Sequence, residues 1–241
     1  MAKQRLQRIL AAAGVDSRRN CEQLILDGAV RVNRRVVDTL PAFADPETDI
    51  ITVHGRRIQA ERKVYYLLNK PKNVICTSHD PQNRRTAVDL LGVGQRVFCV
   101  GRLDADTTGL ILLTNDNELA NRMTHPRYGV PKTYLVTVKG QATGVAAEKI
   151  KKGIWLAEGK TNPAAVKILK RGHVESLVEI TIKQGLNRQL RRMFAQVDLP
   201  VKTLKRTRIG KLDDRRLSVG RFRELTAAEV EYLRKMSGQK A

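Results

Sequence analysis

Apolar side chains three and four positions apart predict a helix over residues 4–13, which Gly14 would end. Asp16-Ser17 then offers an N-cap for a second helix over residues 18–26, and Gly28 is suited to close it in the left-handed conformation. Alternating apolar residues follow, and they predict short strands at 30–32, 36–37 and 49–53. The first 60 residues therefore predict a small mixed module.

A polar stretch, Gln59–Lys63, separates this module (1–60) from the rest of the chain (63–241). Apolar runs in the second part predict strands at 64–71, 97–103, 110–114, 133–138, 165–169, 176–183 and 204–209. Helical spacing predicts helices near 116–123, 144–152, 186–197 and 226–236. Short strands with segregated helices are typical of an α+β fold.

The charge narrows the class of partner. The chain carries 45 basic and 24 acidic residues, a formal net charge of +21, and its sequence pI is about 10.4. Such a field attracts polyanions. No basic amphipathic helix with an aromatic face is visible, so nucleic acid is favoured over a membrane. A generic basic protein is the alternative on composition alone.

Cysteine and histidine are sparse. Cys21, Cys76 and Cys99 stand at wide spacings that fit neither a disulfide framework nor a zinc site, and we expect no metal. No run is long and apolar enough for a membrane span, and no secretory segment follows Met1. These features predict a cytoplasmic protein.

The most informative stretch is Gly101–Asp116, GRLDADTTGLILLTND. Asp104 lies between two apolar runs, 97–100 and 109–113, that are typical of buried strands, and Arg102 lies two residues before it. A carboxylate at the mouth of such a loop is held rigidly, and carboxylates in such places are paired or functional. Catalysis and a structural ion pair or turn aspartate both remain open from the residues alone.

The whole string resembles the catalytic motif of bacterial ribosomal RNA pseudouridine synthases of the RsuA/RluB type. The resemblance implies a catalytic domain built on a mixed, mainly antiparallel sheet with flanking helices. It also implies that Asp104 acts as nucleophile or base while a uridine is flipped out of the RNA, without cofactor or metal. Arg102 would fill the gap that the flipped base leaves; pairing with phosphate is the alternative.

Two further motifs resemble the same family. Lys132-Thr133-Tyr134 matches the motif whose tyrosine stacks on the base, although a tyrosine at a strand start is otherwise usually core. The stretch 184–193, QGLNRQLRRM, matches the third motif, in which Arg191 would pair with Asp104 and keep it ionised. The remaining substrate-binding residues implied there are Asn187, Arg188, Gln189 and Leu190. Gln184 and Leu186 depart from the family pattern. Asn73 stands where glycine is common, and Asn117 replaces a glycine as a left-handed residue.

The N-terminal module resembles the αL RNA-binding domain shared with a small-subunit ribosomal protein. Arg34 departs from the usual glycine, but Asn33 before it can adopt left-handed geometry. Basic residues cluster around two helix N-termini, where phosphate is favourable. The RNA-binding residues implied are Lys3, Arg5, Ser17, Arg18, Arg19 and Asn33. A solvated basic face is the alternative.

Positive charge is concentrated near the C-terminal strand. Residues 183–216 hold 11 basic and 3 acidic residues, whereas residues 1–60 carry a net charge of only +3. Aromatic residues make up 4% of the chain, so phosphate contact with a structured RNA is favoured over base stacking. We expect Lys205, Arg206 and Arg208 to contact RNA; a solvated charge run is the alternative.

Together these motifs predict site-specific isomerisation of uridine to pseudouridine in ribosomal RNA. The stretch 125–130 before the tyrosine motif resembles the large-subunit type, so 23S rRNA is favoured over 16S rRNA. A non-enzymatic ribosome assembly protein is the main alternative, and a nucleic-acid hydrolase lacks a metal-spaced carboxylate pair. The expected partner is ribosomal RNA or a pre-ribosomal particle, with the protein as a monomer.

Overall fold

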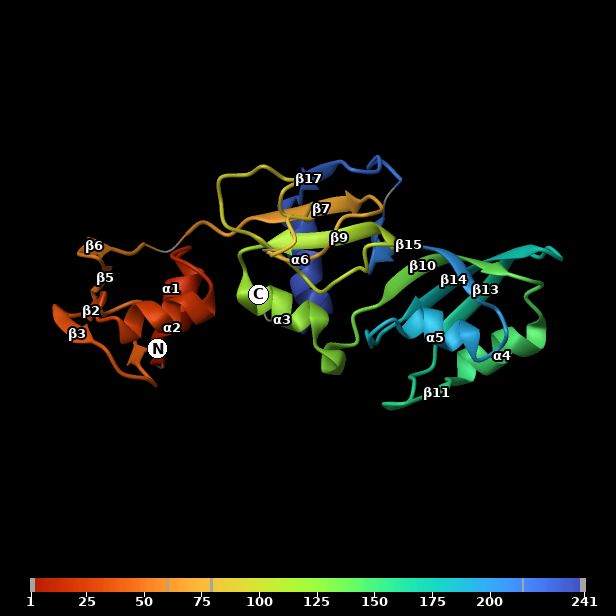
Figure 1. The fold of residues 1–241 in the computed structure, drawn as a ribbon, viewed down its shortest axis with the longest axis horizontal. Helices are drawn as coiled ribbons and strands as arrows, with labels where there is room; N and C mark the ends of the chain where they lie inside the picture. The colour runs from red at the N-terminus through yellow and green to blue at the C-terminus, as the bar shows by residue number, and fades with distance from the viewer. Residues whose placement is uncertain (1–2, 60, 79, 214, 239–241) are drawn as a thin grey trace. The chain divides into compact units, whose positions relative to one another are not determined.

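The computed structural model describes residues 3–59, 61–78, 80–213 and 215–238. Its contacts divide the chain into two compact units, Met1–Val64 and Tyr65–Ala241, which Figure 1 shows in red to orange and in orange to blue. Each unit has its own buried apolar core. The units are described separately below.

The first unit is built on two helices and a small sheet. Helices α1 (Leu6–Ala12) and α2 (Arg18–Leu26) contact each other, and Leu6, Leu10, Cys21, Ile25 and Val30 are fully buried. The four-stranded sheet has the order β3-β2-β5-β6. Its strands are β2 (Val30–Val32), β3 (Arg35–Val37), β5 (Ile51–Val53) and β6 (Arg56–Arg57); β1 (Gln4–Arg5) pairs with β4 (Phe43–Ala44).

Local signals in this unit were predicted correctly. The Ser17 hydroxyl accepts a hydrogen bond from the Asn20 amide at 3.1 Å and so caps α2. Gly28 follows that helix with φ +69°, and Asn33 turns the chain with φ +50°. The Asn33 side chain stabilises this turn, because it donates to Asp49 at 2.8 Å and accepts from the Ile50 amide at 2.9 Å.

The second unit contains one large sheet with the strand order β13-β14-β10-β15-β9-β7-β17. Only the β15–β9 pairing is parallel, so the predicted mixed, mainly antiparallel sheet is confirmed. The long strands are β7 (Tyr65–Lys70), β9 (Thr108–Thr114), β10 (Lys132–Lys139), β13 (Ala165–Lys170), β14 (Glu175–Ile182) and β15 (Val201–Ile209). Short strands are β8 (Phe98–Cys99), β11 (Trp155–Leu156), β12 (Gly159–Lys160), β16 (Leu212–Asp213) and β17 (Phe222–Glu224).

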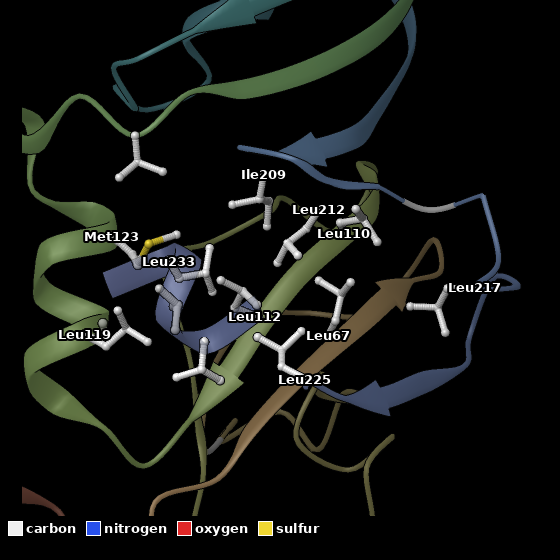
Figure 2. Packing of buried hydrophobic residues seen from close by; sticks show 14 residues of the cluster. Leu67, Leu110, Leu112, Leu119, Met123, Ile209, Leu212, Leu217, Leu225 and Leu233 are labelled. Carbon is white, nitrogen blue, oxygen red and sulfur yellow. The ribbon is translucent and has the colours of Figure 1, made fainter. Parts of the chain in front are cut away.

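Helices flank this sheet. They are α3 (Asn117–Thr124), α4 (Gly144–Lys152), α5 (Gln189–Ala195) and α6 (Ala227–Met236), with a short 3-10 turn at Pro126–Tyr128. Figure 2 shows leucines from β7 and β9 packed against Leu119 and Met123 of α3 and Leu233 of α6. This core packs against β7 and β9, and the Asp104 loop leads into β9.

The parallel junction between β9 and β15 depends on Gly109. A Cβ atom at this position would lie 2.2 Å from the carbonyl oxygen of Arg206, and the backbone has φ +105°. Only glycine allows the two strands to approach so closely. The junction brings the Asp104 loop, which precedes β9, next to β10 and β15.

Three local expectations were wrong. Asn117 is not left-handed but begins α3, because Asp116 caps the helix by accepting from the amides of Glu118 and Leu119. The predicted strand 97–103 is limited to Phe98–Cys99, since the chain turns at Gly101. The predicted helix 186–197 begins only at Gln189, because Arg188 before it has φ +45°.

Candidate active site

A pocket of about 320 Å³ opens beside the Asp104 loop. Its walls come from that loop, from β10, from β15 and from the loop that leads into α5. Its lining includes every predicted catalytic and substrate-binding residue: Arg102, Asp104, Tyr134, Asn187, Arg188, Gln189, Leu190 and Arg191. Three motifs far apart in the sequence thus meet at one concave site.

Backbone contacts hold the Asp104 loop. The Asp104 carbonyl accepts from the Thr107 amide at 3.0 Å, and the Ala105 carbonyl accepts from the Asn73 amide at 2.8 Å. Asn73, which stands where glycine is common in the family, has φ +61°, in the left-handed region. The Asp104 side chain is 38% exposed. The loop therefore presents a fixed but accessible carboxylate, as a reacting group requires.

The partly buried Cys76 and the buried Lys70 lie beneath the loop. The Leu103 amide donates to Cys76 Sγ at 3.4 Å. The pKa of the Cys76 thiol is lowered to about 6, chiefly by a hydrogen bond from Cys99 and also by the Leu103 amide, Lys70 and Arg206. Burial lowers the pKa of Lys70, whose ammonium donates to the carbonyls of Pro71 at 3.0 Å and Val74 at 2.7 Å. These contacts tie the 70–76 segment to the loop.

The predicted ion pair between Asp104 and Arg191 is not formed. Nη1 of Arg188 lies 3.3 Å from Asp104 Oδ2, whereas Nη2 of Arg191 lies 2.8 Å from Asp106 Oδ2. Arg188 ends the loop before α5, and its left-handed backbone directs the side chain toward Asp104; Arg191 lies one turn later, beside Asp106. The Asp104–Arg188 pair is half-exposed, so it stabilises the fold by about 1 kcal/mol at most.

The other residues of the third motif differ in burial: some hold the loop in place, and one is exposed at the pocket. Gln189 is buried; its Oε1 accepts from the Leu186 amide at 3.1 Å, and its Nε2 lies 3.4 Å from Gln184. Gln184, which departs from the family pattern, thus helps to hold this loop. Leu190 is also buried, while Asn187 is exposed at the pocket.

Arg102 and Tyr134 both line the pocket. Arg102 is exposed and makes no hydrogen bond or ion pair with any residue that the structure describes, so its guanidinium can reach a ligand. Tyr134 is 8% exposed, and its hydroxyl accepts from Nη1 of Arg206 at 3.5 Å. Its ring forms part of the pocket wall.

Arg206, which was expected to contact RNA phosphate, does not lie on an open surface. Arg206 is 3% exposed and lines the pocket, because the parallel pairing with β9 surrounds it with sheet. Its Nε donates to the Leu110 carbonyl at 2.5 Å. Lys132 lines the same pocket, and burial, together with the charge of Arg206, lowers its pKa to about 8.

The other two predicted basic residues of β15 lie outside the pocket lining. Arg208 is half-exposed, and its Nη2 lies 2.9 Å from Glu179. Lys205 precedes Arg206 on β15, so alternation along the strand directs it to the opposite face of the sheet from the pocket. Their contact with RNA stays a prediction.

In the first unit, the predicted RNA-binding residues differ in what they contact. Lys3, Arg5, Arg18 and Arg19 are exposed, and the two arginines open α2. Neither Arg18 nor Arg19 forms a side-chain hydrogen bond or ion pair with a residue that the structure describes, so both guanidiniums are available to phosphate. Ser17 and Asn33 use their side chains within the fold.

The described residues form neither a metal-binding cluster nor a membrane-spanning helix. Within the described ranges, no three or more His, Cys, Asp or Glu side chains are grouped so that they could hold a metal ion. No helix in the described part of the chain is long and apolar enough to cross a membrane.

The pocket thus combines an accessible carboxylate, a flat aromatic wall, an apolar side chain and several cations. A carboxylate can act as nucleophile or base, while an aromatic ring and a leucine can hold a planar base between them. The cations suit a polyanionic substrate. This combination fits chemistry on a nucleobase that has been flipped out of RNA.

Comparison with known proteins agrees with this chemistry. A family model described as RNA pseudouridylate synthase matches residues 64–196, and an S4 domain model matches residues 4–40. The chain belongs to the RNA pseudouridylate synthase family and carries an N-terminal S4 domain. Both the family and the RNA-binding module predicted from the sequence are confirmed.

Individual relatives cover almost the whole chain. The ribosomal large subunit pseudouridine synthase B of Bacillus subtilis (strain 168) is 43% identical over 97% of each chain. An uncharacterized RNA pseudouridine synthase of Aquifex aeolicus (strain VF5) is 40% identical over 100% of this chain and 97% of its own. A crystal structure of a pseudouridylate synthase is 31% identical, with a TM-score of 0.69, over 95% of this chain and 99% of that one.

Sequence reasoning missed three charged residues of the site: Lys70, Asp106 and Lys132. Asp106 lies two residues after Asp104, and Lys132 opens the tyrosine motif, so both stood within motifs already singled out. Their roles depend on burial and on partners from other strands, which no local pattern contains. Lys70 precedes a proline at a strand end, where burial of a lysine is not expected.

Proposed function

We propose that this enzyme isomerises a specific uridine in large-subunit ribosomal RNA, with Asp104 as the catalytic carboxylate. The observation that carries the proposal is the meeting of Asp104, Tyr134 and Leu190 at one pocket. The name of the Bacillus subtilis relative supports the choice of large-subunit RNA. We assign Arg102 to the space left by the flipped base, and Tyr134 and Leu190 to the two faces of that base.

Pseudouridine mapping of ribosomal RNA tests this proposal. Cells with and without the protein are compared, and the deleted strain is complemented with wild type or with Asp104→Asn. We expect one large-subunit site to vanish on deletion and to return only with wild type. A vanished small-subunit site would overturn the choice of RNA, and no vanished site despite tight RNA binding would favour an assembly protein.

The partner and location follow from this substrate. We propose that the protein acts as a monomer in the cytoplasm, on ribosomal RNA or on a pre-ribosomal particle. The positive charge supports a polyanionic partner, and the S4 domain supports RNA.

Arg191 is expected to act through Asp106, with which it pairs at 2.8 Å. Arg191→Ala and Asp106→Asn should then cause similar losses of kcat, and the double variant should lose no more than either single one. Single-turnover rates of the wild type, the two single variants and the double variant on the same RNA give this double-mutant cycle. A loss in Arg191→Ala close to that of Asp104→Asn, with Asp106→Asn near wild type, would instead indicate direct action on Asp104.

Arg18 and Arg19 are expected to bind phosphate. The double change to alanine should weaken RNA binding and reduce the slope of log Kd against log salt by about two, one for each lost contact. Binding titrations over a range of salt concentrations measure the slope, and Arg208→Ala serves as the comparison in the other unit. An unchanged slope would contradict the assignment.

A further inference from the structure

Two cations in the pocket, the buried Arg206 and the partly buried Lys132, lack an acidic partner. Lys132 on β10 and Arg206 on β15 both line it, and no carboxylate that the structure describes forms an ion pair with either. Arg206 lies opposite Tyr134 in the β10–β15 register, and Lys132 lies two residues before Tyr134 on the same side of its strand. The two cations therefore flank the aromatic wall of the pocket.

Arg206 is fixed at one end and unsatisfied at the other. Its Nε donates to the Leu110 carbonyl at 2.5 Å, and its Nη1 reaches the Tyr134 hydroxyl only at 3.5 Å. Its Nη2 is buried and has no hydrogen-bond partner among the described residues. A buried charged donor without an acceptor is costly, so the group is suited to an acceptor supplied by a ligand.

Lys132 is similarly short of acceptors. Its ammonium has three donors, yet its contacts are the carbonyls of Met123 and Val130, each at 3.4 Å, the outer limit of a hydrogen bond. Its pKa of about 8 leaves it largely charged at neutral pH. A second, partly buried cation beside Arg206 therefore persists without a strong partner.

The isomerisation makes negative charge on the base, and this argument rests on the proposed function. The C1′–N1 bond breaks with its electron pair left on uracil, where it spreads over N1, O2 and O4. The C1′–C5 bond then forms from that electron pair, a proton leaves C5, and N1 gains a proton. The reaction is balanced without any oxidant or reductant, and its intermediate base is an anion.

We propose that Lys132 and Arg206 stabilise the negative charge that develops on the carbonyl oxygens of the detached uracil. Preorganised donors in a water-poor site lower the barrier most when they face charge that appears only during the reaction. Arg206, with its unsatisfied Nη2, and Lys132, with only two long hydrogen bonds, both line the pocket that holds Asp104. Asp104 and its neighbours act on the sugar or the base, whereas these two cations act on the leaving group.

A change of Lys132 to Met removes the charge and keeps the length of the side chain. Single-turnover pseudouridine formation at saturating RNA should fall by about 100-fold, while the Kd for RNA and its salt dependence stay unchanged. Lys132→Arg should restore most of the rate. Lys139→Met, at the exposed end of the same strand, is the matched control and should keep the wild-type rate.

The pH profile supplies a readout that a structural role would not move. Lys132 is active when charged, so the wild-type rate should fall as pH rises through about 8, and Lys132→Arg should shift this fall to higher pH because a guanidinium stays protonated. The other titratable groups lining the pocket are Arg102, Asp104, Tyr134, Arg188, Arg191 and Arg206. Arg206→Lys, which keeps the charge but loses the Leu110 contact, serves as the second variant and should lose less rate than Lys132→Met.

Each outcome decides between clear alternatives. A wild-type rate in Lys132→Met would overturn the inference and leave the proposed function intact. A weakened Kd with a smaller salt slope and an unchanged saturated rate would identify a phosphate contact instead. Absence of pseudouridine formation by the wild-type chain would refute the proposed function itself. Thermal melts of each variant separate a folding defect from a chemical one.

Discussion

Asp104→Asn is expected to reduce pseudouridine formation by at least about 10⁴-fold, because an amide can neither attack carbon nor accept a proton as a carboxylate does. The stability of the protein should change by less than about 1 kcal/mol, since the carboxylate is 38% exposed and its contact with Arg188 is a partly solvated pair at 3.3 Å. Single-turnover assays and a thermal melt measure the two quantities. RNA affinity should not fall, because a negative charge is removed next to a polyanion.

Asp106→Asn is the matched control for this change. It alters the same chemical group two residues away in the same loop, and its carboxylate pairs with Arg191 rather than facing the pocket. We expect a loss of about tenfold at most, because the variant disturbs positioning and leaves the reacting group in place. Equal losses in the two variants would contradict the assignment of Asp104 as the catalytic carboxylate.

Gly109→Ala should have the largest effect on stability. The added Cβ would meet the Arg206 carbonyl at 2.2 Å and the Arg206 amide nitrogen at 2.7 Å, in a backbone with φ +105°. Overpacking and the strained conformation together should cost about 3 kcal/mol or more. For a unit of this size the melting temperature should fall by roughly 6–12 °C. Activity should fall too, since the junction positions Arg206 in the pocket.

Gly94→Ala is the control that distinguishes the steric clash at Gly109 from the general effect of replacing a glycine. Gly94 has no left-handed φ, and a Cβ there would meet nothing within 4 Å. Its replacement should leave the melting temperature unchanged or raise it slightly, because alanine restricts the unfolded chain. A drop for Gly94→Ala as large as that for Gly109→Ala would contradict the steric argument.

Short-range signals accounted for much of the fold. The cap at Ser17, the left-handed Gly28 and Asn33, and most strands and helices of the second unit were predicted from neighbouring residues. Such features depend on interactions within a few positions of the chain. Strand β17 was missed because it is only three residues long and pairs with β7, about 150 residues earlier.

The sequence by itself determined the class of partner and the family, and it singled out Asp104 as the candidate catalytic carboxylate. Net charge depends only on composition, and each motif is a local string whose chemistry follows from its residue types. Asp104, Tyr134 and Leu190 could therefore be named before any fold was known, although their roles await the experiments above.

Only the tertiary structure decided how the charges of the site are partnered. Alternation along a strand could not show that Arg206 is buried beside Tyr134, because that depends on the parallel pairing with β9. Likewise, motif spacing could not distinguish Arg188 from Arg191 as the partner of Asp104. The left-handed backbone at Arg188 lets its side chain reach Asp104 as well as Asp106, whereas Arg191 pairs with Asp106. Ion pairs form between side chains that folding brings within about 4 Å, and long-range strand pairing sets that proximity.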